Sequence, residues 1–535
     1  MTPAAGSALK ARVASLAQAG RAAARAWRRQ APQAARRPET IALAVIILAG
    51  LLLRIAFVLQ WRPALIGFPD AAVYIDDART GIFNDPLRVG GYSEFLVLLH
   101  AIRAHLSFVI EVQHVLGLAS GLLLFGAVRR AGLSAGIALV PVAVVVLGGS
   151  ELFIEHAPLT EALFIFLVDL SLYSLIRTWK GRWGWAAAWA LFAGVALGAA
   201  VDVRSVGLML APVLIVVSAL CAPRAWRVRL LCVLVAALGA ALPIEAYLQA
   251  HQQSQGYGGF AGTGYFDLYA RVAPFAECSK FTPPAGTRKL CISTPPDQRP
   301  GHDYWEFTLL SPAVRVYGEP DSYVPRPHEN SQLRSFAVAA ILGQPWTYLE
   351  YVGRDLVRIV DPSFPSSPYG ATGITGEGYG SSPEQLLGYY FNPGFSNTVQ
   401  IQVSAYYPDD GVVHHNVGFF LTYERDTRIE GPLMALLLLL AFAAPLVTRG
   451  AERRTACLFG VTALILLVGP ILTSEYDYRF TIPAFGALAA TAAIGGSGVL
   501  RGAARSRLRS RLHSRLRSRL RSRPPAPPPP GERSA

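Results

Sequence analysis

Long runs of apolar residues recur along this 535-residue chain, and polar stretches separate them. Each run is close to the ~20 residues that a helix needs to cross the hydrocarbon core of a bilayer. The pattern therefore predicts about ten transmembrane helices. The expected spans are residues 41–60, 106–128, 134–150, 157–177, 184–201, 205–221, 227–247, 431–448, 455–473 and 477–497.

This arrangement predicts an all-α polytopic membrane protein with a large mixed, loop-rich extracytoplasmic segment before its last three helices. The expected parts are a basic cytoplasmic segment (1–40), seven spans with their outer loops (41–247), the extracytoplasmic segment (248–430), three spans (431–497) and a basic, Pro-rich tail (498–535). The first apolar run lies too deep in the chain for a cleaved signal peptide, so we expect it to remain as an anchor.

Composition supports a membrane protein. The chain is 52% hydrophobic and 16% charged, unlike an ordinary soluble protein. Its formal net charge of +14 is concentrated at the termini, which favours an anionic lipid surface over nucleic acid as a partner. No Walker loop or Gly-rich nucleotide-binding turn is found, so the energy for any reaction must come bound in the substrate.

The charges between the expected spans indicate an orientation. Arg and Lys gather in one set of connections, near residues 129–130, 177–182, 224–229 and 449–454, whereas carboxylates gather in the alternate set. Positive residues favour the cytoplasmic side. Both Arg-rich termini would then be cytoplasmic, which requires an even number of spans.

The segment 248–430 is too long for a simple linker and is rich in Tyr, which argues against disorder. Within it, 333–360 shows helical periodicity interrupted by Pro345, as expected for two short helices lying on the outer leaflet. Cys278 and Cys291 also lie in this segment, where a disulfide could persist. We predict that bridge; the alternative is two free thiols in a loop.

The tail repeats Ser-Arg-Leu-Arg over residues 505–523. The repeat places leucines on one face of a helix, which is typical of a basic helix lying on anionic lipid. Low-complexity sequence without a dedicated role explains it equally well.

Candidate chemistry begins with the first expected outer loop. Asp70, Asp76 and Asp77 follow the first span within eight residues, with Tyr74 among them and Tyr92 beyond them. Ionisable groups at the mouth of a span are candidates for function. Asp76 and Asp77 could equally belong to a solvated turn, whereas Asp70 stands directly at the span exit.

The second expected outer loop supplies Glu155, His156 and Glu161. Glu155 and His156 could cap the helix that begins near Pro158, but Glu161 lies inside an apolar run and needs a partner. These groups, with Asp70, are the candidate catalytic residues. Asp70, Glu155 and His156 are also a candidate ligand set for a divalent cation, with Mg or Mn favoured by oxygen-rich ligands.

Arginines near the remaining connections suit a phosphate, because the planar guanidinium group binds two oxygens at once. Arg204 follows Asp202 between two apolar runs, and Arg479 follows Glu475 at the start of the last span. Each could instead pair with that neighbouring carboxylate. We take Arg204 and Arg479 as candidate substrate-binding residues, together with Tyr74, Asp76, Asp77 and Tyr92.

Several short motifs resemble the GT-C class of membrane glycosyltransferases, and within it the family-39, protein mannosyltransferase-like enzymes of actinobacteria. The motifs are Pro69-Asp70-x-x-x-Tyr74, Gly91-Tyr92-Ser93-Glu94-Phe95-Leu96, Gln113-His114-Val-Leu-Gly-Leu, Leu159-Thr-Glu-Ala-Leu-Phe164, Gln344-Pro345-Trp-Thr-Tyr348-Leu and Tyr478-Arg479-Phe480-Thr-Ile-Pro483. The resemblance extends over most of residues 41–497.

The resemblance implies a polyprenyl-phosphate-linked sugar donor that enters from the membrane. It also implies that Asp70 acts as base or metal ligand, and that Glu155 with His156 forms the second acidic group. In the protein-mannosylating members an Asp-Glu pair occupies the first loop, but here Ala71 follows Asp70, which puts a protein acceptor in doubt.

The leading hypothesis is therefore a hexosyl- or pentosyltransferase, with mannose or arabinose as plausible sugars, acting on an envelope glycan, lipid or protein at the outer face. Asp70 would deprotonate the acceptor hydroxyl. A transporter or flippase of envelope precursors would use the same acids as an ion relay. Paired repeats with broken spans, which are frequent in transporters, are not evident here. A structural scaffold would depend on no single acid.

Overall fold

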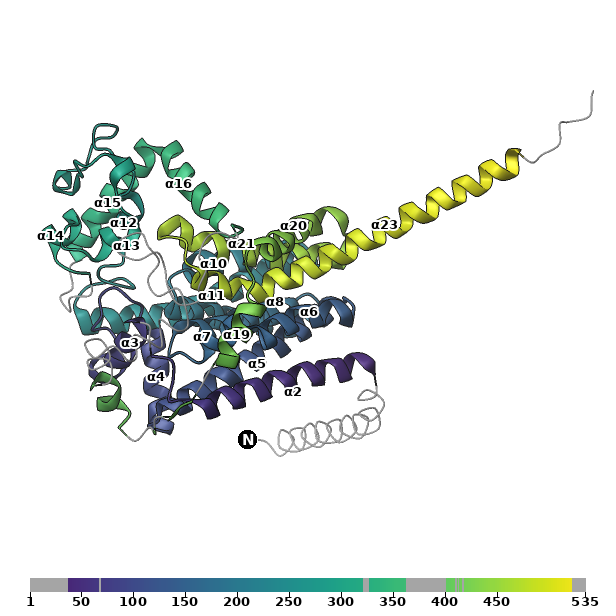
Figure 1. Ribbon diagram of the computed structural model, residues 1–535, viewed down its shortest axis with the longest axis horizontal. Helices are drawn as coiled ribbons and strands as arrows, with labels where there is room; N and C mark the ends of the chain where they lie inside the picture. The colour runs from purple at the N-terminus through teal and green to yellow at the C-terminus, as the bar shows by residue number, and fades with distance from the viewer. Residues whose placement is uncertain are drawn as a thin grey trace, which may run out of the picture.

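The computed structural model describes residues 37–66, 69–320, 327–361 and 401–521, except 409–410, 412 and 416–417. The longer helices run side by side as a bundle (Figure 1). They are α2 (Pro38–Gln60), α5 (Leu106–Ala131), α6 (Ala135–Leu147), α8 (Thr160–Arg177), α9 (Trp183–Val203), α10 (Gly207–Cys221), α11 (Trp226–Gln255), α20 (Gly431–Val447), α21 (Gly450–Thr473) and α23 (Phe485–Arg521).

Shorter elements connect these helices. They are β1 (Trp61–Arg62), α3 (Pro69–Thr80), α4 (Gly91–Ile102), α7 (Gly149–Glu155), α12 (Tyr265–Val272), η1 (Arg288–Leu290), η2 (Pro296–Gln298), α13 (His302–Phe307), α14 (Pro312–Tyr317), α15 (Pro327–Gly343), α16 (Pro345–Arg358), β2 (Val413–His414), α19 (Gly418–Thr427), α22 (Tyr478–Thr481) and η3 (Ile482–Ala484). β1 and β2 form an antiparallel pair, with Trp61 opposite His414.

The structure supports a multi-pass membrane protein. Within the described residues, six helices are long and apolar enough to cross a bilayer. The bent pairs α6–α7 and α19–α20, which turn by 51° and 42°, raise the number to eight if each pair is one span. The predicted number of ten is not confirmed.

The other two expected spans lack the length or the apolar composition of a membrane-crossing helix, for different reasons. Helix α8 carries Glu161, Asp169 and Arg177, and two of these three charged side chains are buried inside the bundle. Helix α10 is apolar but has only 15 residues, fewer than the ~20 that a perpendicular span requires. Apolar composition alone therefore predicted the helices correctly but did not establish that each one crosses the membrane.

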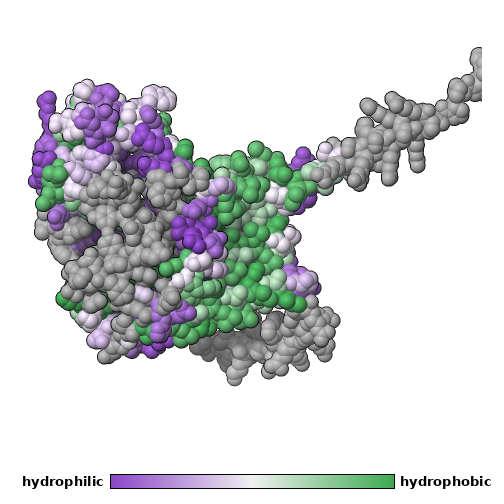
Figure 2. All heavy atoms as spheres, viewed as in Figure 1, coloured by the Kyte–Doolittle hydropathy of each residue, from purple (hydrophilic) through white to green (hydrophobic). Residues whose placement is uncertain are grey.

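The outer surface of the bundle is apolar. Leu48 of α2, Leu238 of α11 and Phe442 of α20 have exposed fractions of 56%, 60% and 63%. Figure 2 shows this hydrophobic surface over the helices, with hydrophilic residues gathered on the part formed by α12–α16. An apolar surface of this extent suits the hydrocarbon region of a bilayer.

Small residues allow α9 and α11 to pack closely against each other. A Cβ atom added to Gly194 or Gly198 of α9 would lie 2.0 Å or 2.3 Å from a carbonyl oxygen of α11. From the other side, a Cβ on Gly239 of α11 would lie 2.4 Å from the Leu191 oxygen. Glycines at such positions let two backbones approach, which is a common way for membrane helices to associate.

Helices α12–α16 form a module around a second hydrophobic core (residues 265–358, hereafter the capping module; Figure 1). Tyr269, Phe275 and Phe336 are among its fully buried side chains. The predicted interruption at Pro345 is confirmed, because α15 ends at Gly343 and α16 begins at Pro345. The Tyr348 hydroxyl donates to the Leu472 carbonyl, joining α16 to α21 at 2.8 Å.

Two features differ from expectation. Described residues of 248–430 are helices and loops rather than a mixed structure, and β2 is their only strand, because the core of the capping module is built from helix faces. The expected boundary at 497 is not a structural break, since α23 continues through the basic repeat to Arg521. A sequence rich in Arg, Leu and Ala can continue a helix after it leaves the apolar region.

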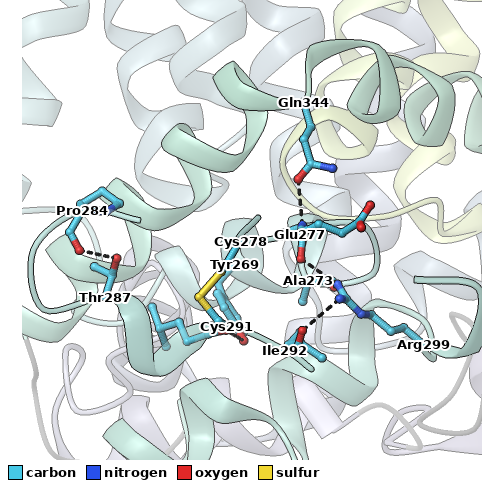
Figure 3. The surroundings of a disulfide bond; sticks show 12 residues. Tyr269, Ala273, Glu277, Cys278, Pro284, Thr287, Cys291, Ile292, Arg299 and Gln344 are labelled. Carbon is cyan, nitrogen blue, oxygen red and sulfur yellow. Dashed lines mark hydrogen bonds between the residues drawn. A yellow bond between two sulfur atoms is a disulfide. The ribbon is translucent and has the colours of Figure 1, made fainter. Parts of the chain in front are cut away.

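The predicted disulfide between Cys278 and Cys291 is confirmed, with a Cα–Cα distance of 5.9 Å. Figure 3 shows how hydrogen bonds fix the surrounding backbone. The Gln344 side chain accepts from the Glu277 amide at 2.8 Å, and Arg299 donates to the carbonyls of Ala273 and Ile292 at 2.8 Å and 3.2 Å.

We predict that the bridge protects its loop from proteolysis. Closing a loop of this size removes conformational freedom from the unfolded chain and is worth about 3 kcal/mol. Lys280, Arg288 and Lys289 are exposed inside it. Trypsin should cut there faster in Cys278→Ser/Cys291→Ser than in the native protein, and native fragments should separate only after reduction. Equal cleavage rates would contradict the prediction.

Candidate functional site

Asp70 lies in the first turn of α3 and is held by two arginines from distant parts of the chain. Its Oδ1 atom accepts from Arg88 Nε at 2.9 Å, and its Oδ2 atom accepts from Arg479 Nη2 at 2.8 Å. Arg88 also donates to Asp85 Oδ2 at 2.7 Å. The segment that follows α2 and the start of the last apolar helix therefore meet at Asp70.

Arg479 extends this cluster to Glu161 at the start of α8. Its Nε atom lies 3.3 Å from Glu161 Oε1, and Arg204 Nη1 lies 2.5 Å from the same oxygen. Arg204 also donates to the Thr160 hydroxyl at 2.9 Å. The Phe480 ring lies under both guanidinium groups, 5.4 Å from Arg204 and 5.3 Å from Arg479.

This cluster, defined here as Asp70, Asp85, Arg88, Glu161, Arg204 and Arg479, contains three carboxylates and three guanidinium groups. The Asp70 side chain is 22% exposed and those of Arg88 and Arg479 are 14% exposed, whereas that of Glu161 is 1% exposed. An incoming molecule can therefore reach Asp70 and the arginines, while Glu161 supports them from behind.

The environment keeps Asp70 ionised. Burial acts to raise the pKa of its carboxyl group, but the charges of Arg88 and Arg479 and their hydrogen bonds lower it well below the ordinary value. Tyr74, one turn further along α3, behaves differently. Burial and the negative charge of Asp70 raise the pKa of its phenol, so Tyr74 remains a neutral hydrogen-bond donor.

Asp76 and Asp77 lie beside the cluster and have other partners. Asp76 pairs with Arg79 at 2.7 Å at the edge of α3. The Asp77 side chain is buried and its Oδ1 atom accepts from the Asp85 amide at 3.1 Å, which ties the following loop to α3. Asp77 therefore has a structural role in the loop, and the predicted contact of Asp76 and Asp77 with substrate stays a prediction.

Glu155 and His156 belong to a second, fully buried cluster. Glu155 accepts from Arg54 Nε at 2.7 Å and Nη2 at 2.6 Å, and from His114 Nδ1 at 2.8 Å. His114 Nε2 lies 3.0 Å from His156 Nδ1, and His156 Nε2 donates to the Trp61 carbonyl at 3.1 Å. The sequence-based prediction placed these two residues with Asp70, but their side chains contact other partners.

The histidines of this cluster constrain its protons. His156 Nε2 carries a proton and donates a hydrogen bond to the Trp61 carbonyl, and His114 Nδ1 carries a proton and donates a hydrogen bond to the Glu155 carboxylate. If both rings are neutral, the two facing nitrogens, His114 Nε2 and His156 Nδ1, each carry a lone pair and no proton. The contact between His114 and His156 is a hydrogen bond only if the pair carries one proton more than two neutral imidazoles.

Tyr92 connects the two clusters. Its hydroxyl donates to the Gln113 side chain at 2.6 Å, and Gln113 donates to the carbonyls of Glu155 and Ala157 at 2.8 Å and 2.7 Å. The Tyr92 ring lies 5.2 Å from that of Tyr74. Tyr92 is fully buried and positions the loop before α8, and its predicted contact with substrate stays a prediction.

The expected cation site of Asp70, Glu155 and His156 does not fit this geometry. Both oxygens of each carboxylate already face guanidinium groups, and both His156 ring nitrogens have hydrogen-bond partners. Positive guanidinium groups at these oxygens would also repel a cation. We therefore assign no metal to these three residues.

Sequence reasoning missed Arg54, whose side chain is 2% exposed in the middle of α2. An arginine inside an otherwise apolar span was itself a signal, since such a charge needs a partner. Gly117 was also missed: a Cβ atom there would lie 1.8 Å from Glu155 Oε1. Arg204 forms its ion pair with Glu161, and not with Asp202, which was the alternative partner.

Comparison with known families adds a direct match. Residues 111–248 match the model of the dolichyl-phosphate-mannose-protein mannosyltransferase family. The resemblance to GT-C membrane glycosyltransferases is confirmed. The matched region contains Glu155, Glu161 and Arg204, whereas Asp70 and Arg479 lie outside it. No curated protein matches the chain.

Solved structures show weaker similarity. The protein O-mannosyltransferase Pmt1-Pmt2 complex of S. cerevisiae is 15% identical over 44% of this chain and 36% of that chain, with a TM-score of 0.32. The oligosaccharyltransferase of Archaeoglobus fulgidus is 14% identical over 92% of this chain, with a TM-score of 0.41. This chain covers 53% of the archaeal protein.

We predict that Asp77 makes stability depend on pH. Burial and the charge of Asp85 raise the pKa of Asp77 from 3.8 to about 8. Over this range the folded protein holds a proton that the unfolded chain releases, so stability falls as pH rises from about 4 to about 8. Thermal unfolding should therefore show a smaller decline for Asp77→Asn than for the native protein. Parallel declines would refute the assignment.

We also predict that Arg54 and Glu155 are coupled. Arg54→Met or Glu155→Gln alone leaves a buried charge without its counter-ion, at a cost of about 3–5 kcal/mol. The double variant Arg54→Met/Glu155→Gln should lose less than the sum of the two single losses in thermal unfolding. Glu350→Gln, in a surface pair with Arg354, is the control with no expected effect. Additive losses would argue against coupling.

Proposed function

We propose that this protein transfers a sugar from a polyprenyl-phosphate donor to an acceptor of the cell envelope, at the outer face of a bacterial plasma membrane. The observation that carries the proposal is the meeting of Asp70 with Arg88 and Arg479 beside apolar helices. The matched family is named for a dolichyl-phosphate-linked mannose donor, which supports a donor of this class.

The arginines suit the phosphate of such a donor. Arg88, Arg204 and Arg479 present planar groups that bind phosphate oxygens in pairs. Their side chains are only about one-seventh exposed, which strengthens electrostatic contacts relative to water. Because the cluster is balanced in charge, a phosphate must compete with Asp70 or Glu161 for at least one guanidinium group.

This competition suggests how Asp70 becomes a base. With Arg88 and Arg479 both bound to it, the Asp70 carboxylate holds protons weakly. Donor phosphate that takes over Arg479 would remove one of these positive partners and raise the basicity of Asp70. The carboxylate could then accept the proton of an acceptor hydroxyl as that oxygen attacks the anomeric carbon and the polyprenyl phosphate leaves.

Glu161 acts through the arginines in this proposal. Its buried carboxylate binds both Arg204 and Arg479, so it fixes the two guanidinium groups at the place where phosphate would bind. Glu155 and His156 fix the preceding helix end instead of contacting the donor. The sugar, hexose or pentose, and the acceptor, whether glycan, lipid or protein, are open in this proposal.

A transporter or flippase of envelope precursors is the second candidate. It is favoured only by the buried acids at membrane depth, such as Asp169 of α8, which is 5% exposed. Turnover of donor by purified protein distinguishes the two, because a transporter moves its substrate without cleaving the sugar–phosphate bond.

We predict that Asp70→Asn lowers sugar transfer from a polyprenyl-phosphate donor by about 10²–10⁴-fold, since a general base contributes on this scale. Arg479→Lys keeps the charge but loses the two-oxygen geometry, so it should mainly raise the KM for donor. The assay is release of polyprenyl phosphate by purified protein in detergent, with candidate acceptors supplied.

The control is Asp426→Asn, which removes an exposed carboxylate on α19 that pairs with neighbouring Arg425. It should leave transfer unchanged. Native turnover in the Asp70→Asn protein would exclude Asp70 as the base, and absence of turnover in every variant and in the native protein would favour the transporter.

A further inference from the structure

A group of metal-binding side chains lies in the capping module, outside the Asp70 cluster. Asp267 belongs to α12, while His302 and Glu306 lie one helical turn apart on α13. Each offers one ligand atom, and these atoms lie within 4.8 Å of one another. This is the only such group of three among the described residues.

The side chains of Asp267, Glu306 and Ser474 surround the imidazole ring of His302. His302 Nε2 lies 3.7 Å from Asp267 Oδ1, and His302 Nδ1 lies 3.6 Å from Glu306 Oε2. Ser474 Oγ lies 3.1 Å from Asp267 Oδ1 and 3.4 Å from His302 Nε2. Asp267 and Glu306 face different nitrogens of the His302 ring, and His302 Nε2 also lies 3.1 Å from the Asp267 carbonyl oxygen. One ligand atom from each of the three residues lies within 4.8 Å of the others, whereas metal bonds of about 2.0–2.2 Å place neighbouring ligands roughly 3–3.6 Å apart. Binding one ion at one ring nitrogen therefore requires the three side chains to rotate closer together.

Two of the three side chains are buried, whereas the third is open to solvent. The side chains of His302 and Glu306 are 6% and 5% exposed, whereas that of Asp267 is 42% exposed. Two carboxylates close to one imidazole favour a cation electrostatically. The exposed Asp267 gives an ion access from solvent and leaves room for water ligands.

We propose that Asp267, His302 and Glu306 bind a divalent cation, with the Ser474 hydroxyl as a further oxygen ligand. One imidazole nitrogen with carboxylate oxygens suits Zn²⁺ or Mn²⁺ better than Mg²⁺, which prefers oxygen ligands and retains its water. The inference does not depend on the proposed sugar transfer.

The location of Ser474 gives the ion a structural role. Ser474 follows α21 directly, and Asp477, three residues later, accepts from the Arg479 amide at the start of α22. A cation shared by Asp267, His302 and Ser474 would fasten the capping module to this turn. The ion would thereby restrict the movement of Arg479, which contacts both Asp70 and Glu161.

The test measures metal on the full-length protein in detergent. After treatment with a chelator, the protein is dialysed against Zn²⁺, Mn²⁺ or Mg²⁺, and bound metal and thermal unfolding are recorded. The native protein should retain about one equivalent of Zn²⁺ or Mn²⁺ and unfold at a higher temperature with it. Hydrogen exchange in residues 474–481 should slow when the ion is bound.

Asp267→Asn and Glu306→Gln should each lower the affinity for Zn²⁺ or Mn²⁺ by at least about 10-fold, because replacing residues at a metal site commonly costs this much. The half-exposed Asp267 is the variant least able to disturb folding, and unfolding without metal checks this. Asp297→Asn, an exposed carboxylate of the same segment, is the matched control and should retain metal normally. No retention by the native protein, or equal retention by Asp267→Asn, would overturn the proposal.

Discussion

The pairing of arginines with carboxylates at the end of an apolar bundle is the constraint on which the rest of the structure depends. Arg479 contacts both Asp70 and Glu161, and these residues come from three separate parts of the chain. Charges so poorly solvated are tolerated only with partners. The ion pairs therefore fix how α3, α8 and the start of the last apolar helix meet.

A second set of buried charges gives the bundle its internal register. Arg54 of α2 binds Glu155 at the end of α7, and the Arg54 Nη1 atom also donates to the Val146 carbonyl of α6 at 2.7 Å. Removing either partner would leave a charge in an apolar region. This requirement holds α2 against the bent pair α6–α7. Through Gln113 it extends to Tyr92 of α4, whose ring lies against Tyr74 of α3.

The sequence pattern grouped Asp70, Glu155 and His156 as one candidate site, whereas the structure places them in two separate clusters. The partly exposed groups around Asp70 form the proposed site for donor phosphate and acceptor hydroxyl, while fully buried groups around Glu155 hold helix ends in place. The capping module adds its own core and disulfide, and it joins the bundle through the bond from Tyr348 to Leu472. Burial thus separates the proposed reaction site from the groups that hold the scaffold, although Glu155 and Glu161 lie only a few residues apart in sequence.

The sequence by itself determined the helical membrane architecture, the interruption at Pro345 and the pairing of Cys278 with Cys291, because periodicity, proline geometry and local spacing are written in short stretches of chain. It also indicated Asp70 and Arg479 as candidates. Only the tertiary structure decided that these two meet, and that Glu155 instead binds Arg54. Ion pairs between residues 409 and 101 positions apart depend on how helices pack, and side-chain pattern along one helix does not specify its distant partner.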